Sequence, residues 1–310
     1  MSANKNCENF VNCQKIYVKL DFMLNKAYIL CMEKYELNEI ERSIIKRHAF
    51  RKKLFSRFTK AVVEYRLVEP YDRIAVCLSG GKDSMLMAML FKELDRQQKF
   101  PFKLEFIAMD PGYSKPNREL LEENAAACGI ALNIFETRIF DAVDRIEKSP
   151  CYLCARMRRG YLYKKAQDLG CNKIALGHHY DDVIETILMS MLWAGQLQTM
   201  MPRLKSQNFE GMELIRPMYY VREDDIKEWA EYNGLHFLRC ACHFTENCSS
   251  LREDGSAVSK RIETKKLIKE LMKKNPYTEA NIFKTVQNVN IDMIPSYKKD
   301  GVIHHFLEDY

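Results

Sequence analysis

No stretch of this 310-residue sequence is apolar over the roughly 20 residues that a membrane-spanning helix needs. Residues 1–12 are polar and lack the apolar core of a signal peptide. Internal repeats and low-complexity segments are also absent. These absences exclude an integral membrane protein and a repeat array. They favour a globular protein of the cytoplasm with no membrane partner.

The sequence also lacks the common P-loop, in which Gly, four residues and Gly-Lys precede Ser or Thr. Val76 stands where the first glycine belongs, and Asp83 follows Lys82. Instead, the apolar run Ile74–Leu78 leads into Ser-Gly-Gly-Lys-Asp-Ser and an amphipathic segment, which predicts strand, turn and helix. Glycine amides and the helix N-terminus attract phosphate, whereas a turn without a ligand would not require the flanking polar residues. We predict a nucleotide phosphate site at Ser79, Gly80, Gly81, Lys82, Asp83 and Ser84.

Eleven cysteines are many for a chain expected in a reducing compartment, so metal or sulfur chemistry is favoured over disulfides. Cys151 and Cys154 form a Cys-x-x-Cys pair before a basic segment, and Cys240, Cys242 and Cys248 follow far downstream. These thiolates suit a structural zinc ion with four ligands or an iron–sulfur cluster with three. A thioredoxin-like role is disfavoured because the pair does not follow the first strand. Of the remaining cysteines, we expect Cys7, Cys13 and Cys31 to be free thiols, and Cys77, Cys128 and Cys171 to be buried.

The net charge of +6 is modest, but the basic residues are clustered. Residues 41–60 hold eight Lys or Arg against one acid, residues 156–165 hold five against none, and residues 259–274 hold seven against two. Any single cluster is equally well explained as a solvated helix face. Three clusters in one chain indicate a polyanionic partner, and RNA or DNA is the usual one.

Strands predicted at 74–78, 103–109, 130–135, 173–176 and 213–218 alternate with predicted helices. This alternation is typical of an α/β fold with a doubly wound parallel sheet. We divide the chain into an N-terminal extension (1–40), a basic helix (41–70), a nucleotide-binding domain (71–220) and a helical, cysteine-containing C-terminal region (221–310). Ligands of such sheets bind at the carboxyl ends of strands, where the strand order reverses. We therefore expect residues 79–84, Asp110 and residues 177–182 to line one site.

The turn at residues 79–84 resembles the pyrophosphate loop (PP-loop) of the ATP-pyrophosphatase superfamily, whose members adenylate a substrate and release pyrophosphate. Residues 151–160 (Cys-Tyr-Leu-Cys-Ala-Arg-Met-Arg-Arg-Gly) and 177–186 (Gly-His-His-Tyr-Asp-Asp-Val-Ile-Glu-Thr) are similar to the tRNA 2-thiocytidine synthetases in particular. The match continues through Ile215-Arg216-Pro217, Arg222-Glu223 and Cys240, and it covers roughly residues 45–295. The resemblance implies an adenine nucleotide α-hydrolase-like fold, related to the Rossmann fold, with helical additions at both ends.

The same resemblance implies ATP, Mg²⁺, a [4Fe-4S] cluster and a tRNA substrate. The implied cluster ligands are Cys151, Cys154 and Cys240. Cys242 competes for the third position, because the family's Pro-Cys-x-x-Cys-Gly turn is replaced here by Arg-Cys-Ala-Cys-His. The implied sulfur donor is a cysteine desulfurase or inorganic sulfide, and a homodimer is left open.

In the implied reaction, a cytidine C2 oxygen attacks the α-phosphate of ATP, and sulfur then displaces AMP. Lys82 and the amides of Gly80 and Gly81 would stabilise the departing pyrophosphate. Asp83, Asp181 or Asp182 would handle the metal or a proton, and Arg158 or Arg159 would steady the adenylated intermediate. Further ATP-binding candidates are Asp110, Gly177 and His178. A direct catalytic role for His178 or His179 is disfavoured, since one of two adjacent histidines usually packs inside.

Two other functions fit parts of the sequence. One is a PP-loop ligase of the lysidine synthetase type, although those enzymes lack the cysteine pair. The other is a zinc-stabilised RNA-binding protein without catalysis, against which the intact phosphate-loop residues argue.

Overall fold

The computed structural model describes residues 38–140, 150–238 and 260–308. The N-terminal extension up to residue 37, with its three cysteines, lies outside these ranges, as do Cys240, Cys242 and Cys248. None of the described helices has the length and apolar character to cross a lipid bilayer. The four proposed divisions of the chain stay a prediction.

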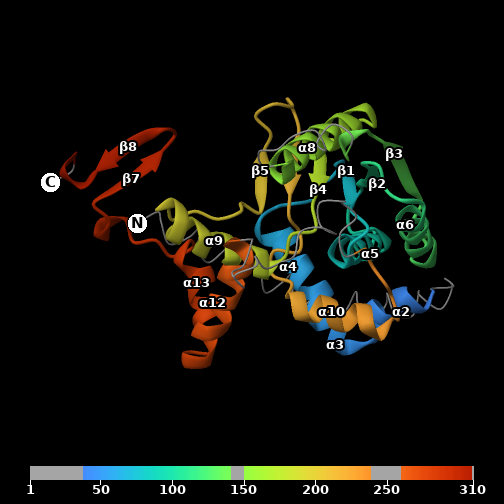
Figure 1. Ribbon diagram of the computed structural model, residues 1–310, viewed down its shortest axis with the longest axis horizontal. Helices are drawn as coiled ribbons and strands as arrows, with labels where there is room; N and C mark the ends of the chain where they lie inside the picture. The colour runs from blue at the N-terminus through green and yellow to red at the C-terminus, as the bar shows by residue number, and fades with distance from the viewer. Residues whose placement is uncertain (1–37, 141–149, 239–259, 309–310) are drawn as a thin grey trace, which may run out of the picture.

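A six-stranded sheet forms the centre of the molecule, with the order β3-β2-β1-β4-β6-β5 (Figure 1). The parallel strands are β1 (Arg73–Leu78), β2 (Lys103–Asp110), β3 (Leu132–Glu136), β4 (Lys173–Ala175) and β6 (Glu213–Ile215). The edge strand β5 (Arg203–Lys205) runs antiparallel to β6. The chain builds outwards from β1 to β3 and then returns to the other side of β1, so the strand order reverses between β1 and β4. The predicted doubly wound, mainly parallel sheet is confirmed.

Alternating side chains of β1 supply two separate cores. Ile74, Val76 and Leu78 point into the larger core, which also contains buried residues of α5 (Lys82–Arg96), α6 (Lys115–Ala127), α9 (Tyr180–Ala194) and α10 (Glu223–Tyr232). Ala75 and Cys77 point to the opposite face, where α8 (Pro150–Asp168) contributes Tyr163 and Ala166. Successive strand residues face opposite sides, which explains why a strand buried on both faces reads as a continuous apolar run. Cys77, Cys128 and Cys171 are buried as predicted.

The basic helix predicted over residues 41–70 is interrupted. The segment consists of α2 (Glu39–Lys46), α3 (His48–Phe50), the π-helical turn η2 (Arg51–Phe55) and α4 (Ser56–Glu64). Arg47 leaves the helical conformation with ψ of 105°, and its guanidinium carbon lies 4.2 Å from the centre of the Tyr232 ring. Phe55, Phe58 and Val62 are nevertheless buried in the core.

The C-terminal part contains α12 (Lys260–Lys274), α13 (Thr278–Thr285) and a hairpin of β7 (Ser296–Lys299) and β8 (Val302–His305). Two short 3₁₀ turns, η3 (Ile291–Met293) and η4 (Phe306–Glu308), flank the hairpin. Helix α12 contacts α9 and buries Thr264 and Ile268. The hairpin extends away from the rest of the molecule (Figure 1). The sequence pattern does not indicate the hairpin.

Candidate active site

The turn between β1 and α5 has the geometry of a phosphate cradle. Gly80 adopts φ of +79°, and Gly81 caps α5 in an extended conformation. The Ser84 hydroxyl donates to the Gly81 carbonyl at 2.9 Å and accepts from the Ser79 amide at 3.1 Å. These bonds fix the turn from inside. The first amides of α5 have no partner within the helix and are available to an anion.

Two neighbouring segments hold this turn in place. A Cβ atom on Gly177, just after β4, would lie 3.1 Å from the Ser84 nitrogen, so a larger residue here would require the backbone of the turn to give way slightly. On the other side, the Leu238 amide donates to the Gly80 carbonyl at 3.2 Å. A Cβ atom on Gly80 would lie 2.5 Å from the Leu238 side chain. The predicted meeting of residues 79–84 with residues 177–182 is therefore present in the structure.

Lys82 lies between two carboxylates. Its ammonium is 3.0 Å from Asp83 Oδ1 and 3.6 Å from Glu223 Oε1. Glu223 also pairs with Lys265 of α12 and, at 3.4 Å, with Lys227. Burial raises the pKa of Glu223, but these three ammonium groups outweigh it and lower the pKa to about 2. Glu223 therefore remains ionised at neutral pH and restrains Lys82 at the edge of the phosphate loop.

The first turn of α9 carries the remaining predicted acids. Asp182 accepts from Arg261 of α12 at 2.6 Å and from the His179 amide at 3.1 Å. Asp181 accepts from the Glu223 amide at 2.7 Å and from Arg222 at 3.2 Å. Burial alone would raise the pKa of Asp181, but its contacts with His179, the Glu223 amide and Arg222 hold that pKa well below its usual range.

The pKa values of the two adjacent histidines shift in opposite directions. Burial lowers the pKa of His179, but the carboxylates of Asp181, Asp182 and Asp83 outweigh it, so the net pKa is raised. His179 Nε2 lies 3.5 Å from Asp182 Oδ2 and 3.9 Å from Asp83 Oδ1. Burial and the nearby Arg216 lower the pKa of His178 to about 4, so its ring is neutral at pH 7. The Nδ1 atom of His178 is buried without a hydrogen-bond partner in the described ranges.

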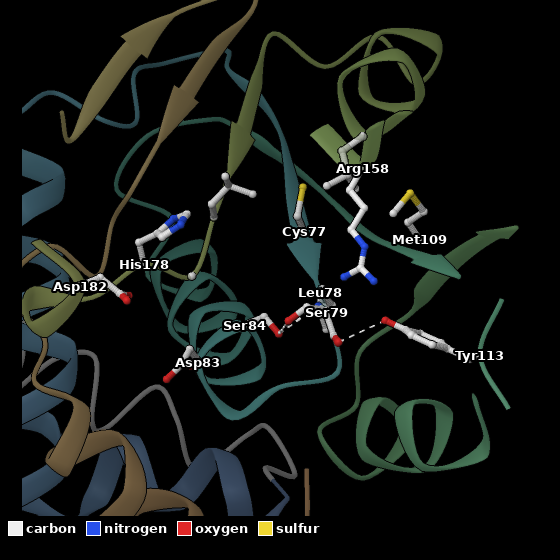
Figure 2. Close-up of a pocket in the computed structure, with 13 residues that line it drawn as sticks. Cys77, Leu78, Ser79, Asp83, Ser84, Met109, Tyr113, Arg158, His178 and Asp182 are labelled. Atoms are coloured by element: carbon white, nitrogen blue, oxygen red, sulfur yellow. Dashed lines mark hydrogen bonds between the residues drawn. The ribbon is translucent and has the colours of Figure 1, made fainter. Parts of the chain in front are cut away.

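A pocket of about 310 Å³ opens at this edge of the sheet. Figure 2 shows the Arg158 guanidinium reaching from α8 towards Ser79, with His178 and Asp182 on the other side of the pocket. Tyr113, on the loop after β2, donates its hydroxyl to the Ser79 carbonyl at 3.4 Å. The predicted site residues that line the pocket are Ser79, Asp83, Ser84, Arg158, Gly177, His178 and Asp182.

Apart from the cysteines, the predicted site residues that do not line the pocket are Gly80, Gly81, Lys82, Asp110, Arg159 and Asp181. Arg159 is exposed. Asp110, at the end of β2, accepts from the Gly112 and Tyr113 amides at 2.9 and 2.6 Å and from Arg118 at 2.7 Å. Burial raises the pKa of Asp110, but these donors outweigh it and lower the pKa. The carboxylate of Asp110 therefore folds the loop that brings Tyr113 to the pocket.

One of the predicted cluster cysteines has a described side chain. Cys154 is buried against Met109, Ile139 and Phe140, one helical turn before Arg158. Cys151 lies in the first turn of α8, its side chain is not described, and Cys240 and Cys242 lie outside the described residues. Within the described ranges, no three His, Cys, Asp or Glu residues converge as a metal site. The set of cluster ligands stays a prediction.

Several residues at the site do not belong to any motif that can be recognised in the sequence. Tyr113 and Cys77 line the pocket, and Arg261 and Lys265 reach its carboxylates from α12. Arg261 and Lys265 look like part of a solvated basic helix in the sequence. Their partners lie 79 and 42 residues away along the chain, so local spacing gives no indication of these pairs.

The sequence matches the model of the PP-loop domain family over residues 50–243. It is 36% identical to the tRNA-cytidine(32) 2-sulfurtransferase of Geotalea daltonii over 245 residues, which cover 78% of this chain and 93% of that protein. The identity to the enzyme of the same name from Shewanella woodyi is 39%, over 77% of this chain and 72% of that protein. The chain belongs to the tRNA-cytidine(32) 2-sulfurtransferase family. The predicted resemblance is thereby confirmed.

A solved structure supports the fold of this family member. The U34-tRNA thiolase NcsA from Methanococcus maripaludis aligns with a TM-score of 0.60 and 22% identity, over 80% of this chain and 81% of that chain. At this level of identity, the likeness shows a shared fold alone.

Proposed function

We propose that this sulfurtransferase family member adenylates a tRNA cytidine with ATP and replaces its C2 oxygen by sulfur, giving 2-thiocytidine. Relatives named for cytidine 32 make that nucleotide the proposed target. The observation that carries the proposal is the pocket itself. In it, the phosphate cradle of Ser79 and Ser84 faces Arg158, on the helix that also bears Cys154.

In the first step, the C2 oxygen of cytidine attacks the α-phosphorus of ATP, and the bond from that phosphorus to pyrophosphate breaks. The departing pyrophosphate gains negative charge. The amides of Gly80, Gly81 and Lys82 face that charge, and the Lys82 ammonium, held by Asp83 and Glu223, neutralises part of it. These donors are fixed before the reaction, so they need little rearrangement in the transition state.

The carboxylates of Asp83 and Asp182 would hold Mg²⁺, which neutralises phosphate charge when bound. Mg²⁺ usually takes one or two carboxylates together with substrate phosphates. The site fits this mode of coordination, because separate carboxylates lie at the phosphate loop and no group of three ligands converges among the described residues.

In the second step, sulfide attacks C2 of the adenylated cytidine, the C2–O bond breaks, and AMP leaves with that oxygen. With sulfide the exchange is redox-neutral. Arg158 extends into the pocket opposite the phosphate loop, where its charge would stabilise the AMP phosphate. A [4Fe-4S] cluster on Cys151, Cys154 and Cys240, with Cys242 as competitor for the third position, would supply an open iron as sulfur carrier. The described part of this set fits, since Cys154 is one turn from Arg158.

The test uses anaerobically reconstituted full-length protein with ATP, Mg²⁺, tRNA and sulfide. We expect tRNA-dependent pyrophosphate release and 2-thiocytidine, detected by mass spectrometry of tRNA nucleosides. Lys82→Ala should lower both products at least about 100-fold, because it removes a fixed donor to the leaving group. Cys154→Ser should retain pyrophosphate release and lose 2-thiocytidine.

The control is Cys171→Ser, which changes another buried cysteine. It should retain both products. Absence of tRNA-dependent pyrophosphate release from the unaltered protein would refute the proposal. Release that is coupled to lysine attachment would indicate the lysidine synthetase type instead.

We further propose that the enzyme acts in the cytoplasm as a homodimer and accepts sulfur from a cysteine desulfurase or from inorganic sulfide. Exposed apolar side chains on the C-terminal hairpin, among them Val302 and Ile303, support self-association. Sedimentation equilibrium should give twice the chain mass of 36.5 kDa, and a single-chain mass would refute the dimer.

A further inference from the structure

Most cations of the first basic cluster, residues 41–60, pair with other side chains of the protein. Lys53 pairs with Glu228 and Arg57 pairs with Asp225, each at 2.7 Å. Lys60 lies over the Tyr220 ring at 4.5 Å. The exposed cations that remain, Arg42, Lys46 and Lys52, lie near the C-terminal end of α5, where Glu41 pairs with Arg96. That end is about 20 Å from the phosphate loop, because α5 rises 1.5 Å per residue.

Three of the five cations in the second cluster, residues 156–165, also have partners within the fold. Arg158 faces the pocket and lies over the Phe140 ring. Lys164 pairs with Asp168 at 2.8 Å, and Lys165 lies over the Phe135 ring. Arg156 and Arg159 are the two cations of this cluster that stay exposed and make no salt bridge within the described ranges.

The third cluster, on α12, has two chemically different faces. One face binds the site, through Arg261 to Asp182 and Lys265 to Glu223. The other face carries Lys266, Lys269 and Lys274, which are exposed and make no salt bridge within the described ranges. We call these three residues the α12 lysine stripe. Lys266 and Lys269 are three residues apart and share a helix face, which Lys273 continues while paired to Glu270. Lys274 lies eight residues from Lys266, at the edge of the same face.

The position of α12 directs this stripe outwards from the active site. The helix starts at the pocket edge, where Arg261 reaches Asp182, and extends away from the sheet beside α13 (Figure 1). Its 15 residues span about 22 Å. At its start, Lys260 lies 5.9 Å from the centre of the Trp193 ring, which is 40% exposed. Exposed aromatic rings beside cations are typical of surfaces that bind unstacked RNA bases.

We propose that the α12 lysine stripe binds the phosphate backbone of the tRNA beside the nucleotide in the pocket. The proposal rests on the proposed function, since it assigns a docking surface to that tRNA. The positive charge of the stripe is complementary to the negative charge of the tRNA phosphates. The helix that carries it begins at the edge of the pocket that the target base would enter. Arg261 and Lys265 then connect the docking helix to Asp182 and Glu223, so RNA binding and catalysis share one rigid element.

The test compares two triple variants of the full chain that lose the same charge. Lys266→Gln/Lys269→Gln/Lys274→Gln removes the stripe, and Arg42→Gln/Lys46→Gln/Lys52→Gln removes the exposed cations at the far end of α5. The tRNA dissociation constant of each is measured over a series of salt concentrations. All six side chains are exposed, so equal melting temperatures should confirm that both variants fold.

For the stripe variant, we expect tRNA binding to weaken about tenfold or more and the slope of log affinity against log salt to fall by about 2 to 3. ATP binding and pyrophosphate release at saturating tRNA should stay unchanged, and the control variant should bind like the unaltered protein. If both variants have the same tRNA affinity and the same salt slope, the α12 lysine stripe is not the tRNA-binding surface. Unaltered protein that binds tRNA through the stripe but releases no pyrophosphate would instead refute the proposed function alone.

Discussion

Gly177 determines how closely the end of β4 approaches the phosphate loop. In Gly177→Ala, the new methyl group would lie 3.1 Å from the Ser84 nitrogen and 3.2 Å from the Asp83 carbonyl carbon. Both neighbours are backbone atoms, so the cradle itself must shift. We expect ATP affinity to fall about tenfold or more, equivalent to about 1.4 kcal/mol, as measured by calorimetric titration.

The matched control is Gly160→Ala in α8, where nothing lies within 4 Å of the added carbon. This change should leave ATP binding intact and stabilise the helix by about 0.5–1 kcal/mol. Normal ATP affinity in Gly177→Ala would show that the loop tolerates displacement.

His178 makes stability depend on pH in a defined direction. Burial and Arg216 lower its pKa from the ordinary 6.5 to about 4, so between these values the unfolded chain holds a proton that the folded chain does not. Unfolding free energy should therefore fall as the pH drops from about 6.5 to 4, by up to about 3 kcal/mol from this residue.

His178→Gln should lose less stability across this range, as measured by urea denaturation at several pH values. His179 has a raised pKa and contributes with the opposite sign in both proteins, so its effect largely cancels in the difference. If the unfolding free energies of the two proteins change equally with pH, the pKa of His178 is not lowered by folding.

At the scale of elements, Arg261 joins α12 to α9. Its guanidinium lies 2.6 Å from Asp182 and 3.6 Å from Glu185, whose pKa burial raises. In Arg261→Gln, both carboxylates lose this cation. We expect thermal unfolding to show a loss of about 1–2 kcal/mol, together with a lower kcat.

Lys273→Gln serves as the comparison, because its pair with Glu270 is exposed on the same helix. Such surface pairs contribute at most about 1 kcal/mol, so kcat should not change. If kcat is unaltered in Arg261→Gln, the contact between Arg261 and Asp182 contributes to stability alone.

The sequence predicts the long elements well because their packing follows local periodicity. Strand β1 and helix α5 are readable from one apolar run and one amphipathic segment. Strand β5 has only three residues, and the β7–β8 hairpin is exposed, so neither has an apolar pattern. The break at Arg47 involves Tyr232, 185 residues downstream, which no local window includes.

The candidate site divides in the same way. Residues within a contiguous motif, such as Ser79, Ser84 and Gly177, could be predicted because backbone geometry brings the strand ends together. Asp110 was expected at the ligand and instead folds the Tyr113 loop, since its carboxylate finds backbone donors two and three residues ahead. Arg261 and Lys265 depend on tertiary contacts with α9 and α10, which local spacing does not encode.

At the scale of the molecule, the C-terminal hairpin contributes little to the folding of the described chain. The strands β7 and β8 bury no side chain, and Val302 and Ile303 are 58% and 67% exposed. Removal of residues 295–310 should change the unfolding free energy by less than about 0.5 kcal/mol, because surface changes usually have such small effects.

Chemical denaturation of the shortened protein provides the measurement, with ATP titration as a check that the pocket is intact. A loss of several kcal/mol would mean that the hairpin stabilises the sheet domain. If the shortened protein also becomes a single-chain species, the hairpin forms the dimer contact.

The bond between Gly80 and Leu238 ties two parts of the proposed reaction together. Leu238 precedes Cys240 by two residues, and its amide donates to the first glycine of the phosphate loop. In the proposed reaction, a displacement of this loop on pyrophosphate departure would therefore act on the chain that leads to a proposed sulfur-handling cysteine. Such a contact would allow the nucleotide and sulfur half-reactions to be ordered in time.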